Sequence, residues 1–540
     1  MRSSTFRKIS KGEIRAWVRG DVLNDLPSSF LDDPISSVAK MESEVLKESK
    51  WRWAALLRLS NGRRVFLKRD RTKDWVEGLK YLFSPSKGQK EFLIASRLEG
   101  RGLHLPQPLG WMERVRRGWV RESYYLSEAI GSGISLIEEA AKSKEPRSIA
   151  ELAMTVRKFQ EAGLFHRDLH GGNLLWEGDT LFLTDLHRAK IIKSLSLRRR
   201  LWNLSHLFHS LRSTWGEMEQ LRFLDQYFEG RLDGSQKKEI LHRKIHPVMD
   251  RLQKRQWRSR TKRCLKESTQ FAVEREKRVR YFHRRDFSLG RLKRVMAEHQ
   301  NLVREKPFSL IKYSPEVIVS ILNDEGERIC LKQFCYPSLW TRMKEQLRLS
   351  KGFKSWRAAH GMRARGFPSL KPFAMVERKD WLGPRESFLL MEAPADDQEM
   401  DRYILRGFED LNKKRLFIKT FARWLDGFHK MRLYHKDMKT CNILVSEKEE
   451  TWSFHLLDFE DILMDENVNR KKLFKSLLQI NTSTPKVMTK VDRYRFFREY
   501  LRLNPIVKDQ KVFLRGLMEE SRRRGLVYVS PQGVVTEAMG

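Results

Sequence analysis

The segment 165–175, FHRDLHGGNLL, and the segment 434–444, YHKDMKTCNIL, decide the fold. Each contains a histidine, an aspartate two residues later and an asparagine five residues beyond the aspartate. A short apolar stretch and a further aspartate follow, and a lysine lies upstream in a predicted strand that reads RRVFLKRD or ERICLKQF. In chain order, the two sets are Lys68, Asp168, Asn173 and Asp185, and Lys332, Asp437, Asn442 and Asp458.

This ordered set contains the residue types that phosphoryl transfer from Mg-ATP requires. A lysine neutralises the nucleotide phosphates, an acid orients the attacking hydroxyl and accepts its proton, and an amide and a second acid hold the metal. A single H-x-D would be equally consistent with ordinary polar loop residues. Because the full order recurs in the same strand context, the sequence predicts phosphotransfer sites that use ATP and Mg²⁺.

The rest of the chain repeats as well. RRVFLKRD recurs as ERICLKQF, RGLHLPQPLG as RGFPSLKPFA, and SYYLSEA as SFLLMEA, each 264 residues further on. The offset rises to 269 at the H-x-D segments, as small insertions in loops would cause. The length alone would allow about three or four domains. The repeat instead predicts two homologous domains, residues 1–260 and 261–540, joined within the basic stretch RLQKRQWRSRTKRCLKES.

The first part of each repeat is predicted to be rich in strands and the second part rich in helices. Apolar stretches on either side of Asn61-Gly62, and of the DEG turn at 324–326, predict β-hairpins. Segments 149–163 and 417–432 have apolar residues at helical spacing and lead into the H-x-D segments. The predicted fold class is therefore α+β, with a small strand-rich lobe and a helical lobe in each domain.

The chain is strongly basic. Lys and Arg number 107 against 69 Asp and Glu, which gives a net charge of +38. This charge argues against a neutral soluble enzyme and favours a polyanionic partner, such as an anionic membrane surface, a phosphorylated substrate or nucleic acid. Nucleic acid is the least favoured of these, because no nucleic-acid-binding module is recognisable. A basic surface without a specific partner is the remaining interpretation.

Cysteine usage and hydropathy indicate the cellular compartment in which the protein is expected. The 4 cysteines include no C-x-x-C pair, which argues against a disulfide scaffold and a structural zinc site. The first residues lack the apolar core of a signal peptide, and no window approaches the roughly 18 apolar residues of a membrane span. We therefore expect a reduced, intracellular protein that is soluble or peripheral on a membrane.

The motifs resemble those of the bacterial lipopolysaccharide core kinases, which are part of the protein-kinase-like superfamily. HRDLHGGNLL before TDLHR, HKDMKTCNILV before LDFED, and the RG-x3-P-x-P-LG and SxxLxEA segments carry the resemblance. It implies two tandem bilobal protein-kinase-like domains that phosphorylate heptose or Kdo sugars of the inner core. The implied site residues are Asp168 and Asp437 as catalytic acids, Lys68, Glu91, Glu128, Lys332 and Glu392 in nucleotide binding, and Asn173, Asp185, Asn442 and Asp458 as metal ligands.

Among these residues, the resemblance implies that Glu91 pairs with Lys68 and that Glu128 and Glu392 lie at the hinge that meets adenine. The second copy departs from the pattern, because Ser355 stands where the first copy has Glu91. Without that carboxylate the second lysine loses its orienting ion pair. The second copy is then slow, uses another acid, or is a degenerate regulatory copy; the first is the better-equipped catalyst.

One residue argues against the second copy being catalytically inactive. Lys439 lies two residues after Asp437, where protein kinases carry a lysine that touches the transferred phosphate. The first copy has His170 at the matching position, as the resemblance to small-molecule phosphotransferases implies. The second copy is therefore not excluded as an enzyme.

Two absent motifs bear on the acceptor. No G-x-G-x-x-G precedes either lysine, and the short segments after Asp185 and Asp458 contain no A-P-E. These features disfavour a kinase that docks peptides and favour a sugar or lipid-linked hydroxyl. The alternatives are a phosphotransferase for another small or lipid-linked acceptor and a membrane-associated pseudokinase scaffold.

The resemblance also implies the partners and the location. The expected acceptor is a lipid-linked sugar of the lipopolysaccharide core. Each basic residue near an anionic leaflet contributes about 1 kcal/mol of attraction, so the basic runs would hold the protein on the cytoplasmic, inner face of the inner membrane. The acceptor hydroxyl, the packing of the two domains and the oligomeric state are not predicted.

Overall fold

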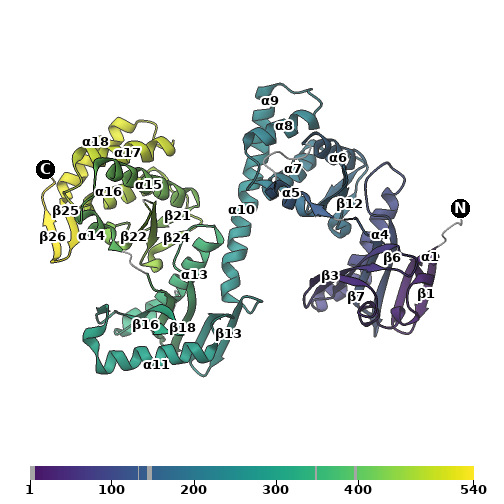
Figure 1. The fold of residues 1–540 in the computed structure, drawn as a ribbon, viewed down its shortest axis with the longest axis horizontal. Helices are drawn as coiled ribbons and strands as arrows, with labels where there is room; N and C mark the ends of the chain where they lie inside the picture. The colour runs from purple at the N-terminus through teal and green to yellow at the C-terminus, as the bar shows by residue number, and fades with distance from the viewer. Residues whose placement is uncertain are drawn as a thin grey trace. The chain divides into compact units, whose positions relative to one another are not determined.

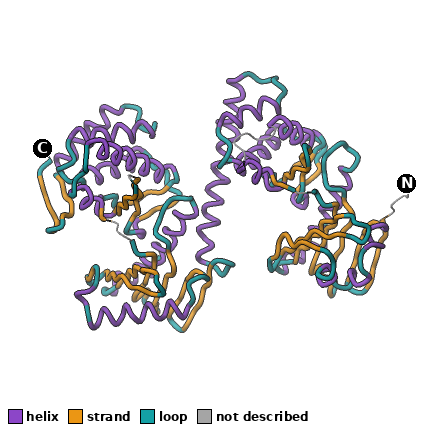
Figure 2. The backbone as a smooth tube through the Cα atoms, in the orientation of Figure 1, coloured by secondary structure: helices purple, strands orange, loops and turns teal. Residues whose placement is uncertain are grey.

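The computed structural model describes residues 6–131, 133–142, 149–346, 349–394, 398–449 and 451–539. The chain divides into two compact units, Met1–Gln253 and Lys254–Gly540. In each unit a strand-rich lobe precedes a helical lobe (Figures 1 and 2), which confirms the predicted α+β fold class. The domain boundary at residue 260 stays a prediction.

The strand-rich lobe of the first unit is, in its described residues, a seven-stranded antiparallel sheet. Its strands are β1 (Phe6–Lys11), β2 (Ile14–Arg19), β3 (Ser43–Glu48), β4 (Arg52–Arg58), β5 (Arg64–Arg71), β6 (Pro108–Arg116) and β7 (Trp119–Glu128). They are ordered β1-β2-β6-β7-β5-β4-β3. The predicted hairpin joins β4 to β5, and Gly62 takes the positive φ of 80° that its turn needs.

Four helices accompany this sheet in the described part of the lobe. They are α1 (Gly20–Asp25), α2 (Pro34–Val38), α3 (Trp75–Phe83) and α4 (Lys87–Leu98). Inward-facing side chains of the sheet, such as Val65 and Leu67 of β5, form one hydrophobic core with the first two helices.

The helical lobe of the first unit has its own hydrophobic core. Figure 1 shows its helices gathered around the short strands that follow the H-x-D segment. The elements are α5 (Leu136–Lys142), α6 (Ile149–Glu161), α7 (Leu197–Leu211), α8 (Glu217–Tyr227), α9 (Gly234–Glu239), and the strands β8 (Ile134–Ser135), β9 (Leu164–His166), β10 (Leu174–Glu177), β11 (Thr180–Leu183) and β12 (Ala189–Ile191). Helix α10 (His246–Thr261) begins in the first unit and ends in the second.

The second unit repeats the sheet position for position. Its strands are β13 (Phe271–Glu276), β14 (Val279–Arg284), β15 (Lys312–Tyr313), β16 (Val317–Asp324), β17 (Glu327–Cys335), β18 (Pro372–Asp380) and β19 (Gly383–Glu392). Their order, β13-β14-β18-β19-β17-β16-β15, matches that of the first unit. The predicted hairpin joins β16 to β17, and both Glu325 and Gly326 in its turn have positive φ.

The remaining elements of the second unit follow the same plan with local differences. Helix α11 (Leu289–Glu305) follows the first hairpin, where the first unit has α1 and α2. The others are α12 (Leu339–Gln346), α13 (Lys351–Ala364), α14 (Met400–Leu405), α15 (Leu411–Lys430), α16 (Arg470–Ser483), α17 (Lys490–Leu503), α18 (Gln510–Arg524), β20 (Gln398–Glu399), β21 (Leu433–His435), β22 (Ile443–Lys448), β23 (Thr451–Leu456), β24 (Ile462–Met464), β25 (Leu526–Ser530) and β26 (Gly533–Glu537). Within the described ranges, no helix has the length and apolar character of a membrane span.

Candidate active sites

Lys68 lies near the middle of strand β5, which holds its side chain inside the first unit with only 6% of it exposed. Its ammonium group donates to Glu91 Oε2 at 2.9 Å and also contacts Asp185 Oδ1. Burial by itself lowers the pKa of Lys68, but the charges of Glu91 and Asp185 outweigh burial and raise the pKa above its ordinary value. Lys68 is therefore a fixed positive charge between two carboxylates.

Helix α4 carries Glu91 to this lysine because the helix packs closely on strand β7. The Ser86 hydroxyl caps its first turn. Gly88 faces the backbone of Tyr124, and a Cβ atom at position 88 would collide with that backbone. The second oxygen of Glu91 accepts from the backbone nitrogen of Leu186 at 3.1 Å. Glu91 thereby ties the helix to the loop that follows the second aspartate.

Asp185 precedes the short 3₁₀ turn Leu186–Arg188 and has a left-handed backbone, with φ of 60°. Its carboxylate contacts Lys68 and lies 2.6 Å from His187 Nδ1. Burial raises the pKa of Asp185, but Lys68 and His187 together hold it well below its ordinary value. Glu91, Asp185 and His187 place possible metal-ligand atoms within 4.8 Å of one another.

A buried histidine joins the H-x-D loop to this second aspartate. His166 Nδ1 accepts from the backbone nitrogen of Asp168 at 3.2 Å, so its Nε2 carries the proton and donates to the Asp185 carbonyl at 3.2 Å. Burial lowers the pKa of His166 to about 4, which keeps the ring neutral near pH 7. Asn173 Nδ2 donates to the Asp168 carbonyl at 3.0 Å. One hydrogen-bond network therefore positions all three predicted polar residues.

The second unit repeats this network. His435 Nδ1 accepts from the backbone nitrogen of Asp437 at 3.2 Å, and its Nε2 donates to the Asp458 carbonyl at 3.2 Å. Burial lowers the pKa of His435 as well. Asn442 Nδ2 donates to the Asp437 carbonyl at 2.9 Å, and Lys332 Nζ donates to Asp458 Oδ1 at 2.6 Å. The structure thus brings the predicted lysine, aspartates and asparagine of each copy into the same arrangement.

Glu460 supplies the carboxylate that the second copy lacks on its helix. Ser355 of helix α13 is fully buried, and its hydroxyl donates to Glu460 Oε2 at 3.2 Å. The other oxygen of Glu460 accepts from Lys332 Nζ at 3.0 Å. Glu460 lies two residues after Asp458, at the position that His187 occupies in the first copy. The lysine's second carboxylate therefore comes from a helix in one unit and from a loop in the other.

Sequence reasoning missed Glu460 because it looked for the missing acid only at position 355. A signal was present: LDFED has an acid two residues after its aspartate, whereas TDLHR has a histidine there. The expectation that the second lysine loses its orienting ion pair is wrong for this structure. Of the open alternatives, the use of another acid is the one that the geometry supports.

The two candidate catalytic acids differ in their neighbours. Asp168 Oδ2 accepts from an Arg188 guanidinium nitrogen at 2.9 Å. Asp437 Oδ2 instead lies 3.1 Å from Lys439 Nζ. His170, which matches Lys439, accepts from a backbone nitrogen within its own loop at 3.1 Å. A cationic side chain therefore reaches the aspartate in both units, but from different segments.

The two predicted hinge glutamates end strands β7 and β19, and their side chains point to other partners. Glu128 pairs with Arg63 at 2.6 Å, and Glu392 Oε2 accepts from the Lys371 backbone nitrogen at 3.2 Å. Each glutamate ends the last strand of its sheet in chain order, just before the chain enters the helical lobe. Their contact with adenine stays a prediction.

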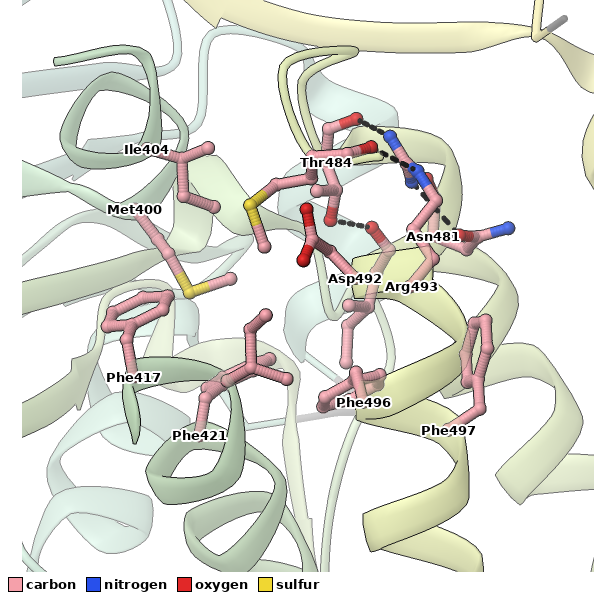
Figure 3. Close-up of a pocket in the computed structure, with 13 residues that line it drawn as sticks. Met400, Ile404, Phe417, Phe421, Asn481, Thr484, Asp492, Arg493, Phe496 and Phe497 are labelled. Atoms are coloured by element: carbon pink, nitrogen blue, oxygen red, sulfur yellow. Dashed lines mark hydrogen bonds between the residues drawn. The ribbon is translucent and has the colours of Figure 1, made fainter. Parts of the chain in front are cut away.

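A small apolar cavity in the helical lobe of the second unit is separate from this chemistry (Figure 3). Its volume is about 40 Å³, and the side chains that line it include Phe417, Phe421 and Phe496. At its edge, Arg493 donates to the carbonyls of Asn481 and Thr484 at 2.6 and 2.8 Å. A space of this size holds about one water molecule. The cavity is therefore a packing feature, and none of the predicted site residues lines it.

The sequence model of the lipopolysaccharide kinase (Kdo/WaaP) family matches residues 37–227 and again residues 339–500. The chain belongs to this family. Because the two matched segments lie in different units, the family domain is present twice, and the predicted tandem arrangement is confirmed.

Solved structures with similarity to this lipopolysaccharide kinase family member include WaaP in complex with acyl carrier protein. That match has 22% identity and a TM-score of 0.31, and it covers 41% of this chain and 91% of WaaP. Another is a Stt7 homolog from Micromonas algae soaked with ATP, with 14% identity, a TM-score of 0.23 and coverage of 35% and 54%. No curated protein matches the chain. The family assignment therefore rests on the family model.

The two segments matched by the family model differ in whether they include the strand lysine. The first matched segment of this family member contains Lys68, Asp168 and Asp185. The second begins after Lys332. In the structure, Lys332 occupies the same strand position as Lys68 and contacts Asp458. The family makes the protein a kinase of lipopolysaccharide biosynthesis, and the structure gives both of its copies a lysine.

Proposed function

We propose that the protein is an ATP-dependent phosphotransferase that phosphorylates a sugar hydroxyl, on heptose or Kdo, of the lipopolysaccharide inner core. One observation carries the proposal: in each unit a charged, buried lysine, an H-x-D aspartate, an asparagine and a second aspartate share one network. This network occurs twice in a member of the lipopolysaccharide kinase family.

In the proposed reaction, the chain's own residues position the groups and move one proton. Asp168 accepts the hydrogen bond of the acceptor hydroxyl and takes its proton as the oxygen attacks the γ-phosphorus. The new sugar O–P bond forms while the bond from the γ-phosphorus to the β,γ-bridging oxygen breaks, which leaves ADP. Lys68 holds the phosphates, and its two carboxylates keep its ammonium group in place. In the second unit, Asp437 and Lys332 have the same roles.

The donor atoms present suit Mg²⁺. Carboxylate and amide oxygens are the ligands that this ion prefers, and the pKa of Asp185 below its ordinary value keeps that carboxylate ionised. Asn173 and Asp185 would hold the metal in the first unit, and Asn442 and Asp458 in the second. When bound, the metal neutralises charge on the transferred phosphate.

We propose that the first unit is the better-equipped catalyst. Its lysine and second aspartate are 6% and 22% exposed, whereas Lys332 and Asp458 are 14% and 42% exposed. Electrostatic interactions are stronger where water is excluded. The second unit keeps every part, so we propose that it contributes a slower, separable activity.

We also propose that the protein works on the cytoplasmic, inner face of the inner membrane, next to its lipid-linked acceptor. Its net charge of +38 supports attraction to an anionic leaflet. A spanning helix is not required for this attraction, because each basic residue near an anionic leaflet contributes about 1 kcal/mol.

The test is transfer of labelled phosphate from Mg-ATP to purified lipid A-core acceptors. Asp168→Ala should lower transfer about 10²–10⁴-fold, the range for removing a general base. Asp437→Ala should remove a smaller, separable part, and the double variant should be inactive. Asp179→Asn, which changes an exposed acid in the β10–β11 turn, is the matched control.

Two results would contradict the proposal. Full transfer by both single aspartate variants would show that the assigned roles are wrong. No label in any lipid A-core acceptor, while the protein still binds nucleotide, would point to another hydroxyl acceptor or to a pseudokinase scaffold.

A further inference from the structure

Helix α3 carries its apolar side chains on the face that points to solvent. Trp75, Val76, Leu79, Leu82 and Phe83 are 73%, 56%, 42%, 52% and 87% exposed. At 3.6 residues per turn these positions form one continuous stripe. A helix on the surface of a soluble protein normally turns such a stripe toward the core, and a contiguous exposed apolar patch marks a surface that contacts a partner or a membrane.

The opposite, more polar side of helix α3 fixes this orientation. Gly78 lies against the Trp119 ring of strand β7, where a side chain would collide. Glu77 lies 2.7 Å from Lys87 Nζ and accepts from the Tyr81 hydroxyl at 3.1 Å. These inward contacts leave only the apolar stripe and Lys80 facing outward. The exposure of the stripe is therefore built into the fold.

The second unit repeats the arrangement at the same place between its lysine strand and its next helix. In helix α12, Leu339, Trp340 and Met343 are 60%, 74% and 52% exposed. Its inward side is again polar: Arg342 pairs with Asp380, and Glu345 lies 2.9 Å from Lys354 Nζ. The helix sequences differ, yet both units have a tryptophan and other large apolar side chains outside and ionic contacts inside.

Basic side chains outnumber acidic ones beside the apolar stripe of helix α3. Lys73, Asp74 and Arg121 line one depression of about 280 Å³ together with Trp75. The adjoining β6–β7 turn adds exposed Arg116 and Arg117. An apolar helix face with tryptophan and phenylalanine, edged by lysine and arginine, has the chemistry of an interfacial helix on an anionic bilayer.

We propose that helices α3 and α12 are the membrane-contacting elements of the two units, and that each lays its apolar stripe into the headgroup region of an anionic lipid bilayer. The inference deepens the proposed location and rests on it, but it does not depend on phosphotransfer. Each helix lies between the lysine strand and the helix that follows, so the same short segment would fix the distance between the bilayer and the nucleotide lobe.

The test is flotation of the full-length protein with vesicles that contain no lipopolysaccharide, in the absence of nucleotide. One set of vesicles contains phosphatidylcholine and roughly 30% phosphatidylglycerol, which mimics an anionic leaflet. The other set contains phosphatidylcholine alone. The triple variant Trp75→Ser/Phe83→Ser/Trp340→Ser should lower partitioning into the anionic vesicles at least about tenfold. The control, Met218→Ser/Val491→Ser/Tyr494→Ser, changes large apolar residues on α8 and α17 that are 61%, 60% and 56% exposed, and should change partitioning less than about twofold.

A charge variant gives a second, independent readout. Lys80→Glu/Arg117→Glu alters only exposed side chains, so it should fold normally and lose binding to the anionic vesicles, and wild-type binding should weaken at high salt. Flotation of the triple variant at the wild-type level, or an equal loss with the control, would overturn the proposal. Retained phosphotransfer without any vesicle binding would overturn it together with the proposed membrane location, and would leave the proposed phosphotransfer intact. Vesicle binding without phosphotransfer would do the reverse.

Discussion

In the first unit the lysine's second carboxylate comes from helix α4, whereas in the second unit it comes from the loop that also carries Asp458. Glu91 and Glu460 both lie within 3.0 Å of their lysine nitrogen. Ser355 now fills the helix position and hydrogen-bonds the relocated acid. The two units therefore keep a negative charge at the same place beside the lysine, although different elements supply it.

The largest loss of transfer is expected when either of these two acids is changed. Glu91→Gln should lower transfer by the first site about 10–100-fold, and Glu460→Gln should do the same at the second, because each leaves a buried lysine with one carboxylate fewer. Each variant is measured with the other site silenced by Asp437→Ala or Asp168→Ala. If Glu460→Gln had no effect, the relocated acid would not serve the second site.

A second prediction exchanges the residues at positions 355 and 460 for those found at the matching positions of the first unit. Glu460→His alone should inactivate the second site as strongly as Glu460→Gln. Adding Ser355→Glu recreates the pair found in the first unit and should restore part of that activity, measured as kcat/KM in the Asp168→Ala background. A double variant no better than Glu460→His would show that helix α13 cannot present a carboxylate to Lys332.

A smaller effect is expected at Lys439, which lies 3.1 Å from Asp437. If it touches the transferred phosphate, Lys439→Met should lower kcat at the second site about tenfold with little change in KM for ATP. His170→Met is the matched change in the first unit, where the ring is held by a backbone hydrogen bond. An equal loss of kcat at both sites would remove this difference between the units.

The smallest effect is expected at the Arg188–Asp168 pair. The side chains are 59% and 34% exposed, and exposed ion pairs contribute about 0–1 kcal/mol. Arg188→Gln should therefore change transfer by the first site less than about fivefold. A loss of a hundredfold would instead place Arg188 on the reacting phosphate.

Much of this architecture could be predicted from the sequence. The repeat offset indicated two copies, and the hairpin at Asn61-Gly62 formed as its turn chemistry dictates. The spacing from Asp168 to Asn173 placed both residues in one loop, where a hydrogen bond now joins them. These predictions succeeded because each depends on residues close in the chain or on a motif whose order is fixed.

The features that could not be predicted depend on contacts between distant segments or contradict a periodicity rule. Glu460 contacts Lys332 across 128 residues of sequence. LDFED does carry an acid two residues after its aspartate, but the sequence alone does not show that this acid reaches the lysine. The helices α3 and α12 have apolar residues at helical spacing, which ordinarily predicts a buried face. Gly78 and Glu77 reverse that expectation by turning the polar side inward.

The glycine contact beneath helix α4 has a counterpart beneath helix α13. The backbone nitrogen of Gly88 donates to Ser123 Oγ at 3.3 Å, and that of Gly352 donates to Ser387 Oγ at 3.1 Å. Moving either helix off its sheet would break this bond and open a gap under the glycine. Each helix is therefore fixed on its sheet by a close glycine contact and a serine hydrogen bond, so a side chain at position 88 would push Glu91 away from Lys68.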